Sequence, residues 1–182
     1  MPGWNRRWTA LSAGAGLLLA GTAAVLLVTD AKPELDETLL REVGPVVHAA
    51  LPTDRELTWP GPLKGRWFCA ERWVETRHID GAVRVGLIAN CSEYARRDGA
   101  LVESAGLHSP LVVTLTPGRN GWRVHDVDVP TDGAGHDASL RRMFTQPGYE
   151  EVRRSMGEPG PDPAVEAREA FRLPVDAPVL PR

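Results

Sequence analysis

The sequence predicts an α+β fold from three observations. Early in the chain, apolar residues such as Leu39 and Val43 recur at helical spacing. Across 66–129 the pattern changes to partial alternation in runs rich in Trp, Val, Ile and Leu, which is typical of strands. Asp80-Gly81 and 119–121 are hairpin turn signals between these runs. A helix followed by four antiparallel strands in a meander, with short helices at the C-terminal end, is the order of an α+β domain whose sheet wraps a helix.

The first predicted helix covers residues 33–51. Gly44-Pro45 interrupts its apolar pattern, so we expect two short helices or one kinked helix. The prolines and glycines of 52–65 predict a loop before the first strand.

The first hairpin joins strands 66–77 and 83–94. If its centre lies on Asp80, residues whose numbers sum to 160 face each other, as Cys69 and Cys91 do. Opposite residues have Cβ atoms about 4.5 to 5.5 Å apart, which suits a disulfide after slight adjustment. A two-residue loop would give 161 instead, so we expect a three-residue loop or a bulge. The same register places on one face Trp67, Cys69 and Trp73 with Val85, Leu87, Ala89 and Cys91.

Two more strands are predicted at 111–116 and 122–129, with the turn 119–121 between them. A helix then runs to Phe144, capped by Asp137 or Ser139.

A second short helix is predicted from Pro147 to Met156, and a third from Asp162-Pro163 to Arg172. The proline-rich tail after residue 173 is expected to be extended. We divide the chain into a membrane segment 1–30, an α+β domain 31–158, and a linker, short helix and tail 159–182.

The N-terminal segment has Arg6 and Arg7, an uncharged stretch 8–29, and then Asp30. About 20 such residues in a helix span a hydrocarbon core. Basic residues before the stretch and acidic ones after it predict a cytoplasmic N-terminus and a single-pass protein with an extracytoplasmic body. The alternative is a cleaved signal peptide and a secreted protein, but 21–23 and 29–31 are poor cleavage sites, so we favour a retained anchor.

Small residues recur at every fourth position of this segment. They lie on one helix face, where a second copy could pack closely as a homodimer. An alternative is that a composition rich in Gly and Ala places them there. The residues are Ser12, Gly16, Ala20 and Ala24.

Composition excludes one class of partner. The whole chain has a net charge of -3, with 21 basic and 24 acidic side chains. Removing Arg6 and Arg7 leaves 19 basic residues and a net charge of about -5, which repels phosphate backbones, so we exclude nucleic acid. Two cysteines in an exported domain again favour a disulfide.

Four motifs carry a resemblance to a known group of domains. They are Phe68-Cys69, 91–94 (CSEY), 109–112 (SPLV) and 130–133 (PTDG). Over residues 67–144 the chain resembles small, uncharacterised, secreted or membrane-attached bacterial domains related in shape to the cystatin-like or nuclear-transport-factor-2-like roll. Thr131 departs from the group, which more often has a basic residue there. The group has no assigned activity, so the resemblance implies no catalytic residue.

Four side chains are candidates for a pocket in the concave face of the sheet. Glu71 falls between Cys69 and Trp73 on the predicted inner face, where an ionised carboxylate is costly unless it is paired. A bulge that turns Glu71 outward is the interpretation we favour. The resemblance places Glu93 and Tyr94 together at a strand end, as a rim pair. The candidates are Glu71, Trp73, Glu93 and Tyr94.

The densest group of metal-ligand residue types lies between 125 and 137. His125, Asp126 and His136 are the candidates, but their spacing matches no established motif, and a solvated strand edge explains them equally well. We therefore predict no metal and no cofactor. The other members of the group are Asp128, Asp132 and Asp137.

No nucleophile elbow, thiol-protease pattern or phosphate-binding glycine loop is present in the sequence. We therefore favour a non-enzymatic, membrane-anchored, extracytoplasmic module that binds an envelope protein or a small ligand. The alternatives are a small enzyme with a polar pocket in the sheet, and a structural component of the envelope.

Overall fold

The computed structural model describes residues 32–181, which form a five-stranded mixed sheet and four α-helices. The predicted α+β class is confirmed. The predicted membrane segment and its stripe of small residues lie outside the described residues. Within 32–181, none of the helices combines the length and hydrophobicity that a bilayer crossing requires.

Helix α1 (Glu37–Ala50) is one continuous helix that contains Pro45. Of the two expected forms, two short helices or one kinked helix, the first is therefore wrong. Pro45 is exposed and removes only one helical hydrogen bond, while Val43 and Val47 on either side of it are fully buried and hold both halves on the sheet. The Asp36 carboxylate caps the helix by accepting from the N–H groups of Thr38 and Leu39.

The sheet is the predicted meander with one added strand. Strands β1 (Arg66–Ile79), β2 (Ala82–Arg97), β3 (Ala100–Gly118) and β4 (Gly121–Asp128) follow one another, and β5 (Val179–Pro181) pairs in parallel with β3. β3 begins at Ala100, well before the predicted start at 111, and β5 was not predicted. Gly106 and Pro110 disfavour a strand locally, so this half of β3 depends on its pairing with β2.

The hairpin register is the predicted one, and a bulge produces it. Asp80 and Gly81 form a two-residue turn with φ of 50° and 79°, which pairs Ile79 with Ala82. The register then shifts by one residue between Trp73 and Glu75. Cys69 consequently lies opposite Cys91, and the two form the predicted disulfide, with Cα atoms 4.1 Å apart.

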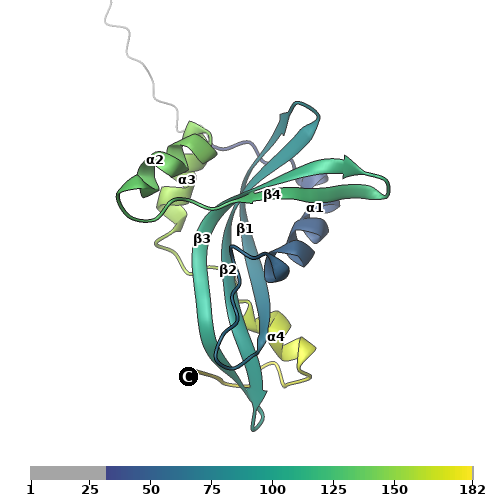
Figure 1. The fold of residues 1–182 in the computed structure, drawn as a ribbon, viewed down its shortest axis with the longest axis vertical. Coiled ribbons are helices and arrows are strands. Elements are labelled where there is room, and N and C mark those ends of the chain that lie inside the picture. Colours follow the sequence, from purple (N-terminus) through teal and green to yellow (C-terminus); the bar gives the residue numbers. More distant parts are fainter. Residues whose placement is uncertain (1–31, 182) are drawn as a thin grey trace, which may run out of the picture.

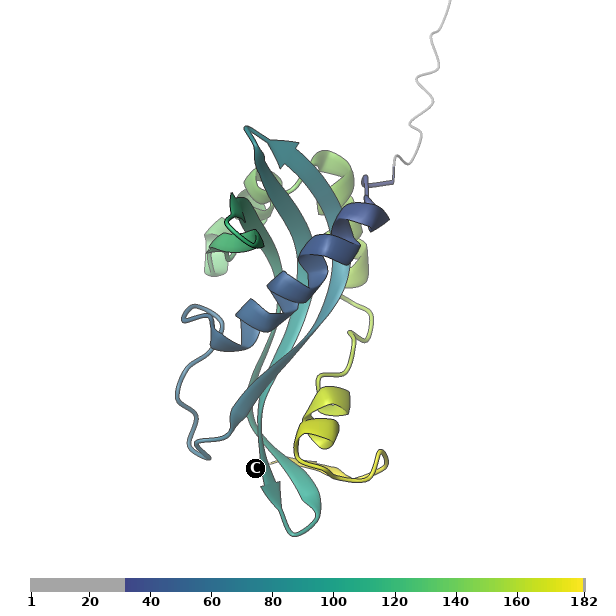
Figure 2. The ribbon, with the colours of Figure 1, turned by 90° about the vertical axis from the view of Figure 1, so that its right-hand side faces the viewer.

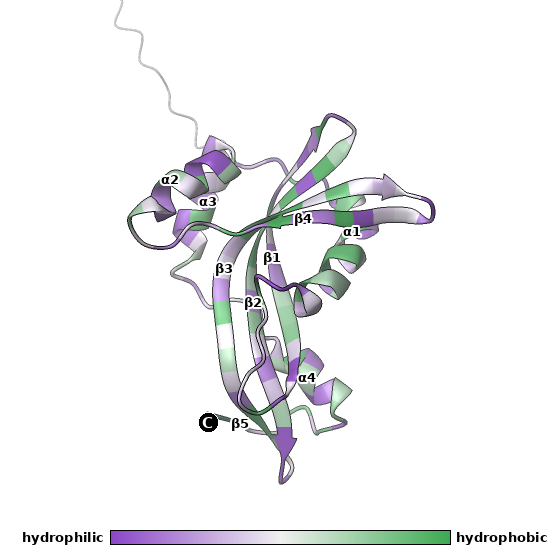
Figure 3. Ribbon diagram, viewed as in Figure 1, coloured by the Kyte–Doolittle hydropathy of each residue, from purple (hydrophilic) through white to green (hydrophobic). Residues whose placement is uncertain are grey.

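Helices cover both faces of the sheet (Figure 1). α1 crosses one face, as Figure 2 shows, and its apolar side packs on the buried residues of β2 and β3. This α1 face includes the predicted row around Cys69 and Cys91. Hydropathy follows the same division, with hydrophobic positions on α1 where it meets the strands (Figure 3).

The opposite face carries the C-terminal helices. α2 (His136–Met143) and α3 (Gln146–Ser155) cover one end around Val112, and α4 (Ala164–Ala170) covers the other end around Phe68. The predicted caps of the first of these helices are wrong, because α2 starts after Gly135 and has no side-chain cap. Residues 159–181 thus pack against the sheet through α4 and β5.

Both tyrosines should ionise late while the domain is folded. Burial raises the pKa of Tyr94 to about 12, and a hydrogen bond to Asp137 raises the pKa of Tyr149. We expect absorbance titration to show no phenol ionising at the ordinary pKa of about 10, and the urea-unfolded chain to show both. Because the folded state keeps these protons longer, the free energy of unfolding should fall as pH rises above about 10. A folded chain with one phenol at 10 would contradict this, and Tyr94→Phe should remove the component near 12.

Candidate functional site

One stretch of β3 lacks a neighbour on its outer side. β4 pairs with β3 from Val112 onward, and β5 pairs with it only from Leu101 to Glu103. Within the described part of the chain, residues 104–111 therefore have no strand on their outer side and form an open edge, with 105–111 paired to β2 and Ser104 as the extra residue of a bulge. In Figure 1 this part of β3 forms the left border of the sheet, between α2 and the C-terminal strand.

The backbone direction along this edge follows from the disulfide pair. A Cα separation of 4.1 Å marks Cys69 and Cys91 as a pair without mutual hydrogen bonds, so the backbone groups of Cys91 point toward β3. Its partner there is Leu107, whose groups point back toward β2. The groups of Gly106 and His108 therefore point outward, and both residues are exposed. Pro110 shares this phase, so its missing N–H costs no hydrogen bond in the ladder.

A groove of about 400 Å³ runs along the open edge. It touches four consecutive residues of β3, 107–110. Successive side chains of a strand point to opposite faces, so a hollow that touches all four must lie along the backbone edge. This volume falls in the range of ligand sites in proteins. We call it the edge groove.

The edge groove has two walls, one on each face of the sheet. On the α1 face the wall is the loop that holds Glu56, Leu57 and Trp59. Leu57 is fully buried in the core under α1, whereas Trp59 is 47% exposed. Trp59 is held by the indole of Trp67, whose Nε1 donates to the Trp59 carbonyl over 3.1 Å. The remaining lining residues follow β4 or come from the C-terminal helices: Val129, which packs against the core on the α1 face, then Pro130, Asp132 and His136, and Met156, which packs against the core on the opposite face. The residues from Pro130 to Met156 form the second wall.

The charge of the lining is one-sided. Its carboxylates are Glu56 and Asp132, one on each wall, and no lysine or arginine lines the groove. Neither carboxylate forms an ion pair within residues 32–181. Apart from its two histidines, the ionisable side chains of the edge groove are therefore acidic, around a largely apolar floor.

The structure does not bring the four predicted pocket residues into one pocket. Trp73 lies against Gly44 of α1 at the margin of the core. Tyr94 is buried on the opposite face beside Phe68, with ring centroids 6.3 Å apart. None of the four lines the edge groove.

Glu93 is a buried anchor for the loop before β1. The residue is 1% exposed. Its carboxylate accepts a hydrogen bond from the Gly65 N–H over 2.8 Å and another from the Ser104 hydroxyl. A Cβ at Gly61 would lie 1.7 Å from the Glu93 Oε2, so only glycine fits there. This contact positions the loop that carries Trp59.

The candidate metal ligands are also dispersed. His125 and Asp126 are exposed on β4, while His136 lies at the start of α2 in the wall of the edge groove. Within residues 32–181, no three His, Cys, Asp or Glu side chains come together as a metal site. Asp128 pairs with Arg84, and Asp137 accepts from the Tyr149 hydroxyl.

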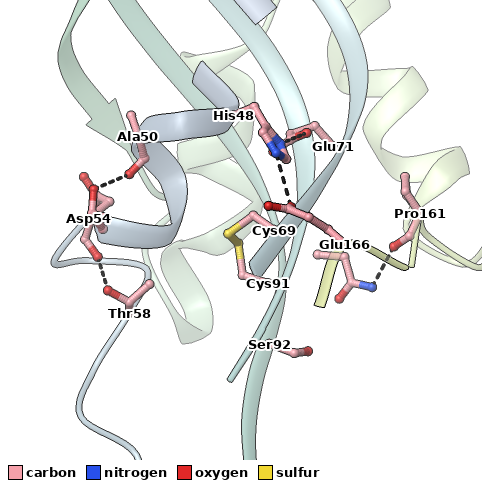
Figure 4. Close-up of a disulfide and its surroundings, with 12 residues drawn as sticks. His48, Ala50, Asp54, Thr58, Cys69, Glu71, Cys91, Ser92, Pro161 and Glu166 are labelled. Atoms are coloured by element: carbon pink, nitrogen blue, oxygen red, sulfur yellow. Dashed lines mark hydrogen bonds and ion pairs between the residues drawn. A yellow bond between two sulfur atoms is a disulfide. The ribbon is translucent and has the colours of Figure 1, made fainter. Parts of the chain in front are cut away.

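Glu71 takes part in a second polar cluster, at the β1 edge (Figure 4). It pairs with Ala89 in the same register as the disulfide, and the bulge lies beyond it at Val74, so the favoured outward turn is wrong. Its side chain is 9% exposed and faces Nδ1 of His48 at 3.0 Å. Nε2 of His48 lies 3.2 Å from Glu166 of α4. The imidazole thus connects α1, β1 and α4.

Replacing Glu71 should change how stability depends on pH. Burial raises the pKa of Glu71, against the opposing effect of His48. The unfolded chain then loses this proton first, so the free energy of unfolding falls as pH rises from about 4.5 through the raised value. Glu71→Gln keeps an acceptor for His48 and should flatten this part of the profile, measured by urea unfolding. Exposed Glu169→Gln is the control, and an unchanged slope in Glu71→Gln would contradict the assignment.

No protein-family model matches the chain, and no curated protein matches it either.

Sequence reasoning missed the edge groove because its residues come from four separate segments. Glu56 and Trp59 stand in a loop, 107–110 were expected to be largely outside a strand, and His136 was considered only as a metal ligand. The one available signal was Trp59, a large aromatic residue among prolines and glycines, which are typical of surface loops.

Proposed function

We propose that the chain is a membrane-anchored, extracytoplasmic binding module, and that it takes its partner, an envelope protein, in the edge groove. The observation that carries this proposal is the coincidence of the groove with the open stretch of β3. An unpaired strand beside an apolar hollow offers both backbone hydrogen bonds and buried contact. The site therefore lies at the sheet edge, whereas the α1 face of the sheet is occupied by core side chains.

Location follows from the sequence and fits the disulfide. The uncharged stretch 8–29 is the proposed anchor, and a Cys69–Cys91 bridge is stable on the oxidising side of a bilayer. We further propose that the helix-covered antiparallel sheet is a variant of the cystatin-like roll, with α2, α3, α4 and β5 as additions.

Site-directed photocrosslinking tests the binding function. A photoreactive phenylalanine analogue would replace Trp59 in the full chain, expressed in the native host. We expect one reproducible adduct with another membrane or envelope protein, since the Trp59 side chain is exposed in the groove wall.

The control is the same analogue at Ile79, which is 38% exposed at the far hairpin tip. Adducts from Trp59 that match those from Ile79, or no adduct at all, would refute the proposed site. Alkaline carbonate extraction of the same membranes tests the anchor, and release of the chain into the supernatant would refute it.

A further inference from the structure

We propose that the edge groove binds an extended, basic peptide segment of its partner, which adds to β3 as a strand. This inference rests on the proposed function, because it concerns the same site, and it specifies the chemistry of the ligand. Three observations carry it: the outward backbone groups, the two walls and the charge of the lining.

The outward backbone groups of β3 can form hydrogen bonds with the backbone of an added strand. Gly106 and His108 each direct an N–H and a carbonyl outward, and Pro110 directs a carbonyl. Among residues 32–181, no hydrogen bond to these outward groups is formed by another backbone segment. At about 3.3 Å per residue, the eight open positions span about 26 Å, which matches a strand of ordinary length.

The two walls suit the alternating side chains of an added strand. Side chains on one face of that strand would meet Glu56 and Trp59, and those on the other face would meet His136 and Met156. A compact small molecule that fills the hollow could contact both walls, but it would leave most of the outward backbone groups without partners. An extended peptide uses both walls and the edge together.

The charge of the lining selects basic side chains. Glu56 and Asp132 supply one carboxylate on each wall, with no lysine or arginine among the lining residues. The exposed Trp59 indole adds an aromatic face for an ammonium or guanidinium group. A second copy of this domain, paired through its own open edge, would bring these carboxylates close to one another, which disfavours that occupant.

A synthetic octapeptide of alternating valine and lysine is the probe. Its binding to the full chain in detergent micelles would be followed by fluorescence anisotropy. We expect saturable binding, weakened about 30-fold when every backbone nitrogen of the peptide is methylated, because at least two backbone hydrogen bonds are then lost. Replacing the lysines by glutamates should weaken binding by more than 10-fold.

The paired substitution Glu56→Gln with Asp132→Asn should weaken binding of the valine–lysine peptide about 10-fold. Both side chains are exposed, so the domain should stay folded. The matched control is Glu169→Gln with Asp176→Asn, two exposed acids that lie outside the edge groove. Equal affinities in the two double variants would overturn the assignment of a basic ligand.

Amide hydrogen exchange locates the contact. In the free protein the amides of Gly106 and His108 should exchange faster than those of Leu107 and Ser109, which face β2. The peptide should slow the first pair by at least 10-fold. If the amides of Gly106 and His108 are instead protected in the free protein, and this protection increases with protein concentration, a second copy occupies the edge and the proposal is overturned.

The outcomes separate the two proposals. If the methylated peptide binds as tightly as its parent, strand addition is wrong. If neither the valine–lysine peptide nor its methylated form binds the full chain, the assignment of a basic, extended ligand is wrong. In both cases a specific adduct from position 59 would leave the binding function standing, whereas its absence would remove that function.

Discussion

Replacing both Cys69 and Cys91 by alanine is expected to lower the free energy of unfolding by about 3 kcal/mol. The bridge joins residues 22 apart in sequence, and a loop of that length restricts the unfolded chain by about this amount. Both cysteine residues are buried, at 1% and 0% exposure, so lost packing adds to the effect. Urea unfolding measures the change, and the slope with denaturant should rise because the uncrosslinked unfolded chain exposes more surface.

The reduced wild-type chain is the control for this experiment. It keeps both sulfur atoms in the core but lacks the covalent link, so its stability should lie between those of the oxidised chain and the double variant. Equal stability of the oxidised and reduced chains would contradict a stabilising bridge. A count of free thiols in protein isolated from its native host tests the compartment. We expect no free thiol, because both cysteines belong to the bridge.

Replacing Glu75 by alanine is expected to lower the free energy of unfolding by about 3 kcal/mol. Glu75 is 1% exposed on β1, where its Oε1 lies 3.2 Å from Nε of Arg77. It also accepts from the backbone N–H of Thr145, at 3.1 Å, and from the Thr145 hydroxyl. Thr145 caps α3, so the carboxylate fixes the start of that helix on the sheet.

Glu75→Ala leaves the backbone N–H and the hydroxyl of Thr145, and the largely buried Arg77 guanidinium, without this carboxylate. For a domain of this size, 3 kcal/mol corresponds to a fall in Tm of about 9 °C, measurable by calorimetry. Glu75→Gln keeps an acceptor and should lose less, whereas exposed Glu169→Ala should stay within about 0.5 kcal/mol of the wild type. A loss as small for Glu75→Ala as for Glu169→Ala would show that the buried carboxylate does not hold α3.

Local chemistry predicted most of the hairpin. The turn residues, the alternation and the paired cysteines gave the register, because a two-residue turn with one bulge has few solutions. The helix near the start of the chain was also predicted, but whether Pro45 divides it into two helices was left open. There the burial of Val43 and Val47 decides, and that burial depends on strands far along the chain.

The buried carboxylates show the opposite case. Glu75 and Glu93 are each 1% exposed, although charged residues in strands ordinarily face solvent. These carboxylates accept hydrogen bonds from Thr145, Ser104 and Gly65, and no local sequence pattern connects those donors to them. Glu71 falls on the predicted inner face, but we favoured a bulge that turns it outward, because its partner His48 could not be identified from spacing.

The sequence by itself determined the fold class, the meander, the disulfide pairing and the expectation of an exported body, because these depend on local periodicity, turn chemistry and composition. Only the tertiary structure decided where β3 begins, how the C-terminal helices cover the sheet, and where the edge groove lies. An unpaired edge is defined by which strands stop short of it. That information is distributed over β3, β4 and β5, and it becomes visible only when the strands are assembled.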